Sequence, residues 1–346
     1  MMEVVTGGSG SGKSAYAEQK ICGLQQGTGR LYYIATMYPY GSETERKIEK
    51  HRWMRAGKGF RTLEWYTGLS ECIEKKFSGQ EGAERLSESS ILLECMSNLV
   101  ANELYMEQGA GTDTVRSVTE GIRRLKEQSR NLVIVTNEVF SESVPDSVEN
   151  YKKVLGEINR NLAGMADQVT EVVYGIPWIW KKDAGCTPGR RVEYAVDHHK
   201  ENTMKNYEKT GKDPERKNVH LIIGGAFQGK LQYAETLYSK ICWYDGAECQ
   251  PEQLEKELTE IDGIVHFEQL VRRWMEDGRE TEELTGLLMN RRKGLVLISD
   301  EIGYGLVPVD AFERKYREAH GRLMTDLAAQ AQRVDRVVCG IGTRLR

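Results

Sequence analysis

The sequence predicts an α/β fold in which helices cover both faces of a mostly parallel sheet, encoded twice in tandem. Two observations support this prediction. Short apolar runs alternate with longer helical patterns along the first half, which is typical of parallel strands joined by helices. The second half then repeats the landmarks of the first half in the same order. We therefore expect one architecture in two copies.

The expected elements of the first half can be placed along the chain. A glycine-rich loop leads into a predicted helix at residues 15–24. Ser42 and Glu45 have the spacing of a capping box, so a second helix is predicted over residues 43–56 and should end at Gly57. The predicted apolar strands lie at residues 4–5, 31–35, 91–93 and 132–136.

The repeat rests on two pairs of matching segments. GGSGSGKSAYAE and TNEVFSESVP in the first half correspond to GGAFQGKLQYAE and SDEIGYGLVP in the second. The second copy is shorter, because Lys13 lies 124 positions before Asn137 whereas Lys230 lies 70 positions before Asp300. The missing residues fall between the glycine loop and the strand that ends at Asp300.

Three segments follow from this repeat. Residues 1–180 form the first, complete domain of the predicted arrangement. Residues 181–218 are polar and rich in Lys, Glu, Asp and Asn, which is typical of a linker. Residues 219–346 form the shortened copy. A fused second copy could replace one subunit of an assembly, and whether several chains also associate stays open.

The composition argues against several classes of protein. Of the 346 residues, 39% are apolar and 29% are charged, as in ordinary globular domains. The net charge of −4 gives no electrostatic reason to expect nucleic acid as a partner, and no apolar run approaches the ~18 residues of a membrane helix. The N-terminus does not resemble a secretory signal, and the seven cysteines contain no C-x-x-C pair. We therefore expect free thiols in a reducing cytoplasm.

The loop after the first strand matches the phosphate-binding pattern G-x-x-x-x-G-K-[ST], which predicts a P-loop NTPase-type fold. Its glycines let backbone N–H groups turn toward phosphate oxygens at a helix N-terminus. Lys13 would reach the β- and γ-phosphates of ATP or GTP, and the Ser14 hydroxyl would bind Mg²⁺. The alternative is a glycine-rich turn without a ligand. The residues of the loop are Gly7, Gly8, Ser9, Gly10, Ser11, Gly12, Lys13 and Ser14.

Glu94 is the predicted acidic partner of this loop. It ends the apolar run Ile-Leu-Leu-Glu, so its carboxylate should lie at the carboxyl edge of the sheet, where ligands of α/β proteins bind. We expect Glu94 and Ser14 to hold the metal, whereas a solvated strand end is the alternative. Asn137 and Glu138 end the next strand and are weaker candidates for the same edge.

The helix predicted over residues 43–56 carries a basic face. Lys47, His51 and Arg55 lie four residues apart and therefore share one side of the helix. A histidine among cations suits phosphate binding, and a neutral imidazole could act as a nucleophile toward phosphorus. The alternative is a basic face that is exposed to water.

These segments together resemble one enzyme family. VVTGGSGSGKS, LYYIATM, RKIEKHRWMRAGKGFRTLE, ILLECMSN and VIVTNEV occur in the order found in the bifunctional adenosylcobinamide kinase/adenosylcobinamide-phosphate guanylyltransferase of cobalamin biosynthesis. The resemblance covers about residues 1–180 and, in degraded form, about residues 219–346. The full set of segments is specific, whereas each one alone is weak evidence.

The resemblance implies a two-step reaction on a corrinoid substrate. ATP or GTP would phosphorylate adenosylcobinamide, and GMP would then pass from GTP to the product through a guanylylated His51, with Mg²⁺ as the cofactor. Lys13 and His51 would be catalytic. The residues that bind the corrinoid are not indicated. The further nucleotide contacts that the resemblance implies are Ala35, Thr36, Met37, Arg52, Trp53, Met54, Arg55, Glu64 and Glu94.

The first half departs from the family at one turn. The family pattern N-E-V-G-x-G-x-V-P has glycines where this half has Phe140, Ser141 and Glu142, whereas the second half keeps Gly303 and Gly305. Glycines at such a turn indicate positive φ angles or a close approach to a ligand. One hypothesis is that the two halves complement each other across a shared site.

The second half alone is predicted to be non-catalytic. Leu231 replaces the serine or threonine that would bind Mg²⁺, and His266 stands where the acidic strand end is expected. A structural role is favoured over a phosphate-binding remnant. For the whole chain, the alternatives to the family reaction are a P-loop kinase with another acceptor and a nucleotide-binding regulatory module. The enzyme is favoured because one half keeps an intact Lys13, Ser14, Glu94 and His51. A regulator would need to bind nucleotide but would need no nucleophile.

Overall fold

The structure is a computed structural model in which the chain forms two compact units. The first unit comprises Met1–Arg190 together with Gly303–Pro308, and the second comprises Arg191–Ile302 together with Val309–Arg346. Most of the expected linker and the turn at residues 140–142 lie outside the described residues. The structure describes residues 1–25, 29–79, 86–138, 146–182, 190–191, 217–238, 240–248, 250–291, 294–305, 308 and 310–346.

The first unit is built on an eight-stranded sheet of order β3-β2-β4-β5-β1-β6-β7-β8. The strands from β3 to β6 pair in parallel, and β7 runs antiparallel to β6. This arrangement confirms the predicted mostly parallel sheet. The strands are β1 (Met2–Thr6), β2 (Leu31–Ala35), β3 (Phe60–Glu64), β4 (Ser90–Glu94), β5 (Asn131–Val135), β6 (Gln168–Val173), β7 (Ile176–Lys182) and β8 (Arg190–Arg191).

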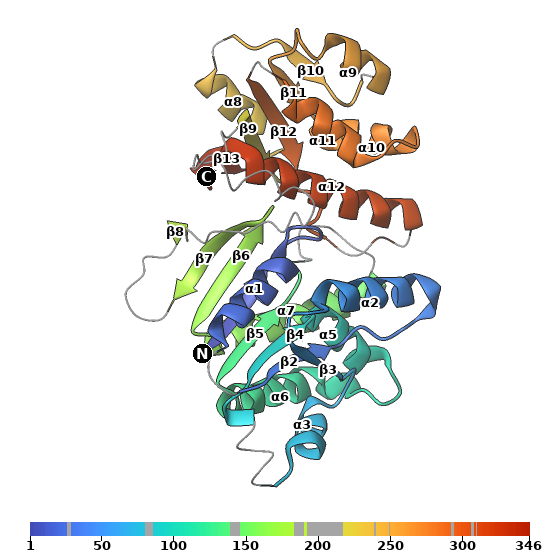
Figure 1. Cartoon of the computed structure of the whole chain (residues 1–346), viewed down its shortest axis with the longest axis vertical. Helices are drawn as coiled ribbons and strands as arrows, with labels where there is room; N and C mark the ends of the chain where they lie inside the picture. Colours follow the sequence, from blue (N-terminus) through green and yellow to red (C-terminus); the bar gives the residue numbers. More distant parts are fainter. Residues whose placement is uncertain are drawn as a thin grey trace. The chain divides into compact units, whose positions relative to one another are not determined.

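Helices cover both faces of this sheet, as Figure 1 shows. Successive side chains of a strand point to opposite faces. Val4 therefore joins the core beneath α3, α5, α6 and α7, whereas Val5 joins the core beneath α1. The helices are α1 (Lys13–Leu24), α2 (Gly41–Arg55), α3 (Leu69–Phe77), α5 (Met96–Tyr105), α6 (Thr114–Gln128) and α7 (Asp146–Met165), with a short 3₁₀ helix at Gly111–Asp113.

The second unit has a six-stranded sheet of order β10-β11-β12-β9-β13-β14. Its strands are parallel except for β14, which runs antiparallel to β13. The elements are β9 (Lys217–Gly224), α8 (Lys230–Leu237), β10 (Trp243–Asp245), α9 (Pro251–Glu257), β11 (Gly263–Val265), α10 (Phe267–Glu276), α11 (Thr281–Met289), β12 (Leu295–Asp300), α12 (Ala311–Gln330), β13 (Ala331–Val338) and β14 (Ile341–Arg344).

The two sheets share their strand order. The series β2-β4-β5-β1-β6-β7 of the first unit corresponds to β10-β11-β12-β9-β13-β14 of the second, with the antiparallel pair at the same end. The predicted duplication with a shortened second copy is therefore confirmed. Over the part of the chain that the structure describes, the second unit passes from β10 through α9 to β11 and has no counterpart of α2 and β3.

The predicted helix over residues 43–56 is present as α2, but its predicted capping box is wrong. The helix begins at Gly41, Tyr40 is its N-cap, and no side chain caps it. Ser42 therefore lies inside the first turn rather than at the cap. Spacing alone could not identify the first residue, because the glycine before Ser42 was free to enter the helix. No described helix has the length and apolar character needed to span a membrane.

Candidate active site

The loop between β1 and α1 has the backbone that its glycines permit. Gly10 and Gly12 have φ angles of 71° and 86°, in the left-handed region that favours glycine. A Cβ on Gly7 would lie 2.5 Å from the carbonyl oxygen of Val172 in β6, so the loop passes too close to its neighbour for a side chain. The N-terminus of α1, with its partial positive charge, thus opens onto the loop.

Lys13 is buried at the first position of α1. Its Nζ donates a hydrogen bond of 2.9 Å to the carbonyl oxygen of Gly8. Burial lowers the pKa of Lys13, and the neighbouring Cys95 and Glu94 act in the opposite direction. The ammonium group is therefore held across its own loop, in the position from which such a lysine can meet a phosphate.

Glu94 joins the glycine loop to the edge of the sheet. The Ser14 hydroxyl donates a hydrogen bond to one oxygen of Glu94, and the Tyr33 hydroxyl donates to the other at 3.0 Å. Burial raises the pKa of Tyr33, and Glu94 raises it further, so the phenol stays protonated and donates. The carboxyl ends of the adjacent strands β2 and β4 therefore meet the start of α1, where α/β proteins bind ligands.

The pair of Ser14 and Glu94 fits the predicted magnesium position. Both supply hard oxygen ligands, and Mg²⁺ commonly takes one or two protein ligands while water and phosphates fill the rest. A Mg²⁺ site here would therefore not need a full set of protein ligands. Among the residues that the structure describes, no group of three or more His, Cys, Asp or Glu side chains is placed to hold a metal.

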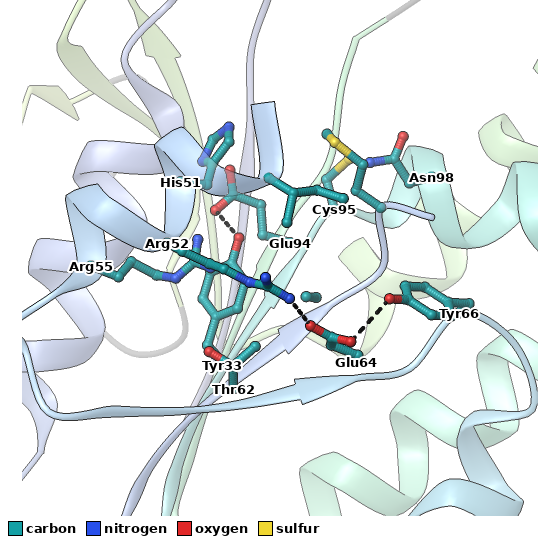
Figure 2. Close-up of a pocket in the computed structure, with 13 residues that line it drawn as sticks. Tyr33, His51, Arg52, Arg55, Thr62, Glu64, Tyr66, Glu94, Cys95 and Asn98 are labelled. Carbon is teal, nitrogen blue, oxygen red and sulfur yellow. Dashed lines mark hydrogen bonds and ion pairs between the residues drawn. The ribbon is translucent and has the colours of Figure 1, made fainter. Parts of the chain in front are cut away.

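A pocket lies beside this edge (Figure 2). It is formed by β2, β4, α2 and β3 and by the residues that follow these strands. It contains six of the predicted site residues from separate segments, together with Glu94. The lining residues are Tyr33, Ala35, Met37, Ile48, His51, Arg52, Arg55, Thr62, Glu64, Tyr66, Glu94, Cys95 and Asn98.

Arg55 is the most buried described side chain of α2. It is 6% exposed, and its guanidinium lies 3.5 Å from the centre of the Tyr33 ring. A cation over an aromatic face is attracted by the ring, more strongly where water is excluded. Its buried Nε and Nη1 atoms have no hydrogen-bond partner among the described residues. Arg55 therefore presents unused donors beside Glu94 and His51.

Arg52 and Glu64 form an ion pair at the same pocket. The Arg52 guanidinium contacts the Glu64 carboxylate, and the Tyr66 hydroxyl donates to the other Glu64 oxygen at 3.3 Å. Both partners of the pair are about half exposed, so the pair contributes little stability. Figure 2 shows the chain of contacts from Arg52 through Glu64 to Tyr66. These contacts orient the Arg52 guanidinium in the pocket that also contains His51.

A partly buried ion pair attaches the segment after α2 to α1. The Lys58 ammonium lies 2.5 Å from the carboxylate of Glu18, whose side chain is 4% exposed. Burial raises the pKa of Glu18, and the contact with Lys58 acts against that rise. Gly57 and Gly59, with φ angles of 86° and 79°, flank the lysine and let the chain turn there. The helix that carries His51 is thus held next to the glycine loop.

The eight residues of the glycine loop lie outside the pocket lining, and so do three of the further nucleotide contacts that the resemblance implies. Thr36 is fully buried, and its hydroxyl donates to the carbonyl oxygen of Cys95 at 2.7 Å. Its backbone N–H also bonds to Glu94, so Thr36 fixes the position of the strand ends. Trp53 is 76% exposed on α2. The side chain of Met54 lies outside the described residues.

Several lining residues were not predicted from the sequence. Tyr33 lies in a buried apolar strand, where an aromatic residue indicates core packing rather than a site. Thr62 belongs to β3, two positions before Glu64, and side chains two positions apart in a strand share a face. Asn98 follows Glu94 in the first turn of α5. The alternation rule could have identified Thr62, but no local signal distinguishes Tyr33.

Comparison with known proteins decides the family. A sequence model of the family described as cobinamide kinase / cobinamide phosphate guanyltransferase matches residues 3–179 and again residues 264–345. The chain belongs to this cobinamide kinase/guanyltransferase family. The first match spans the glycine loop, Glu94 and the pocket, and the second lies within the shortened half of the chain.

Three similar proteins from bacteria match over nearly their whole length. The bifunctional adenosylcobalamin biosynthesis proteins CobU of Escherichia coli (strain K12) and Salmonella typhimurium are each 32% identical, over 193 and 189 residues. CobP of *Pseudomonas aeruginosa* is 26% identical over 179 residues. Each match covers 51% of this chain but 95–97% of the relative. About half of this chain therefore lies beyond the length that these relatives match.

Proposed function

We propose that the first unit phosphorylates adenosylcobinamide and then transfers GMP from GTP to adenosylcobinamide phosphate. Membership of the family supports the two reactions. One structural observation supports their location: Glu94 accepts a hydrogen bond from Ser14 of the glycine loop and also lines the pocket that contains His51. The groups needed for phosphoryl transfer and for covalent transfer thus lie at one edge of the sheet.

In the first reaction, the substrate hydroxyl attacks the γ-phosphorus of the nucleoside triphosphate. A bond forms between that oxygen and phosphorus, the bond to the leaving nucleoside diphosphate breaks, and the hydroxyl proton is released to water. Lys13 and the loop N–H groups are placed to balance the negative charge that develops. Mg²⁺ held at Ser14 and Glu94 would supply further positive charge next to the phosphates.

In the second reaction, a ring nitrogen of His51 attacks the α-phosphorus of GTP. A nitrogen–phosphorus bond forms, and pyrophosphate leaves with the electrons of the broken phosphoanhydride bond. A phosphate oxygen of the corrinoid product then attacks the same phosphorus and releases His51. The guanidinium groups of Arg52 and Arg55 line the pocket beside His51 and suit the charge of the transferred phosphate.

Intact-protein mass spectrometry tests the covalent step. The protein is incubated with GTP and Mg²⁺ and then analysed at neutral or alkaline pH, because a phosphorus–nitrogen bond is labile in acid. We expect the mass of one GMP on the wild type and none on His51→Ala. His266→Ala is the matched control, since this histidine lies in the second unit and should leave the adduct unchanged.

Two results would overturn parts of the proposal. An adduct that persists in His51→Ala would assign the nucleophile to another residue. No adduct on a wild type that demonstrably binds GTP would contradict the transferase reaction and favour a P-loop kinase with another acceptor. Adenosylcobinamide and its phosphate are then supplied in turn, and formation of adenosylcobinamide-GDP identifies the acceptor.

A further inference from the structure

A short segment from late in the sequence belongs to the first unit. Gly303–Pro308 clusters with Met1–Arg190, although the residues on either side of it belong to the second unit. In the repeat, Gly303 and Gly305 occupy the turn at which the first copy has Phe140, Ser141 and Glu142. The glycine turn of the family pattern is therefore present in the first unit, but another part of the chain supplies it.

Within this unit, Gly303 contacts the glycine loop directly. The backbone N–H of Ser9 donates a hydrogen bond of 2.8 Å to the carbonyl oxygen of Gly303. A Cβ on Gly303 would lie 2.6 Å from the carbonyl oxygen of Ser9, and one on Gly8 would lie 3.0 Å from the carbonyl carbon of Gly303. The backbones at Gly8 and at Gly303 thus approach so closely that a side chain on either glycine would push the two segments apart.

Tyr304 attaches the same turn to the sheet. Its hydroxyl donates a hydrogen bond of 2.7 Å to Glu171 in β6. The other carboxylate oxygen of Glu171 accepts from Trp180 Nε1 at 2.9 Å. The ring also lies against the loop, since a Cβ on Gly8 would be 3.0 Å from one of its carbons. Glu171 is buried, so this anchor is a charge-assisted hydrogen bond away from bulk water.

We propose that Gly303 and Tyr304 are positioning residues that hold the phosphate-binding loop of the first unit in its nucleotide-binding shape. The loop works through the directions of its N–H groups, and the Ser9 N–H is fixed by Gly303. A short segment that the repeat assigns to the second copy thereby takes part in nucleotide binding within the first unit. This inference rests on the proposed function in taking the glycine loop as the triphosphate site.

Nucleotide affinity of the full chain tests the proposal. The dissociation constant for a non-hydrolysable GTP analogue with Mg²⁺ is measured by calorimetry, together with the melting temperature. Gly303→Ala should weaken binding roughly tenfold, since the added methyl group overpacks the contact with Ser9. Gly286→Ala is the matched control: it makes the same change in α11, where a Cβ meets no atom within 4 Å, and should bind as the wild type does.

Tyr304→Phe provides a milder second variant that decides the matter if Gly303→Ala does not fold. Loss of its hydroxyl should weaken nucleotide binding about threefold. A purely structural role would lower the melting temperature of both variants and leave their nucleotide affinity unchanged, which would overturn the proposal. Tighter binding would also overturn it, because the Gly303 carbonyl would then compete with phosphate for the Ser9 N–H.

The same measurements separate this proposal from the proposed function. A wild type that binds no nucleotide would refute both. A wild type that binds the analogue but forms no GMP adduct would refute the transferase reaction alone. Wild-type affinity in both Gly303→Ala and Tyr304→Phe would refute only the positioning role.

Discussion

Arg55 shows how a residue in the pocket obtains its chemistry from its surroundings. The sequence places it on the basic face of a helix, and a face of that kind is usually exposed to water. In the structure it is buried over the ring of Tyr33, which is fixed by its hydrogen bond to Glu94. The planar guanidinium can stack on the ring and still direct its N–H groups into the pocket, whereas an ammonium group cannot do both.

We expect Arg55→Lys to weaken GTP binding by about tenfold, because the variant keeps the charge but loses the stacking and the fixed donors. Calorimetry with GTP and Mg²⁺ measures the change. Arg46→Lys, an exposed position on the same helix, is the control and should have no effect. An unchanged affinity in Arg55→Lys would show that only the charge at this position matters.

A second residue-scale observation concerns the buried polar groups shared by the two copies. In the first unit, Glu3 on β1 accepts hydrogen bonds from Tyr16 on α1 and Thr170 on β6. In the second unit, Asp335 on β13 accepts from Tyr233 and contacts His220 of β9. The buried carboxylate is therefore on the central strand β1 in the first unit and on β13, the neighbour of the corresponding strand β9, in the second. Each copy keeps one buried carboxylate with its partners, so the network survived while its residues changed.

His320 gives the stability of the second unit a dependence on pH. Burial lowers the pKa of His320 to about 3 from an ordinary value of 6.5, and its Nε2 lies 3.0 Å from the Ser299 hydroxyl. The folded state keeps this imidazole neutral while the unfolded chain takes up a proton below pH 6.5. The contribution of His320 is therefore fully present above pH 6.5 and is lost as the pH falls toward 3.

We expect the free energy of unfolding of the second unit to fall by about 2 kcal/mol between pH 6.5 and pH 5 because of this one group. Urea titrations at both pH values measure the fall. His320→Gln keeps a hydrogen-bonding side chain beside Ser299 but cannot titrate, so its fall should be smaller by that amount. Equal falls in the two proteins would show that His320 is not responsible.

At the scale of elements, the two glycine loops have the same shape but different charges. Gly12 and Gly229 have φ angles of 86° and 81°, and both lysines donate to a carbonyl oxygen of their own loop. Lys230 also forms an ion pair with Asp300, where the first copy has Asn137. In the second loop, the charge of Lys230 is therefore balanced by Asp300 of the same unit. This loop also has Leu231 in place of the serine expected to bind Mg²⁺.

We expect one nucleotide to bind per chain, at the first loop. Lys13→Ala should abolish binding of GTP with Mg²⁺, because the lysine meets the phosphates. Lys230→Ala should leave both the affinity and the stoichiometry unchanged, since its charge is already paired with Asp300. Calorimetric titration of the three proteins measures both quantities. A stoichiometry of two, or weaker binding in Lys230→Ala, would contradict this prediction.

The elements also show how far the sequence could predict the site. The first strands and α1 were predictable because their apolar runs and their glycine loop are local signals. His51 and Arg55 were predictable on one helix face together with Lys47, whereas Arg52 was indicated only by the family resemblance. Tyr33 was not, because its partners in the pocket come from distant segments and its strand is indistinguishable from ordinary core.

At the scale of the whole molecule, the duplication was predictable because its landmarks keep their order. The structure adds that the strand order is kept while α2 and β3 have no described counterpart in the second unit. The sequence could mark Gly303 and Gly305 as a surviving turn, but the contact of Gly303 with Ser9 joins segments that are far apart in the chain. Only a folded structure assigns that turn to the first unit.

The assignment of Gly303–Pro308 to the first unit has a consequence for the history of the gene. No single break in the coding sequence separates the two units, because the first is encoded on both sides of most of the second. A stop codon after the first copy would therefore not leave a complete first unit, since it would remove Gly303–Pro308. Selection would retain the second copy even without catalytic activity of its own, because the first unit contains Gly303–Pro308, and the fusion would be difficult to reverse.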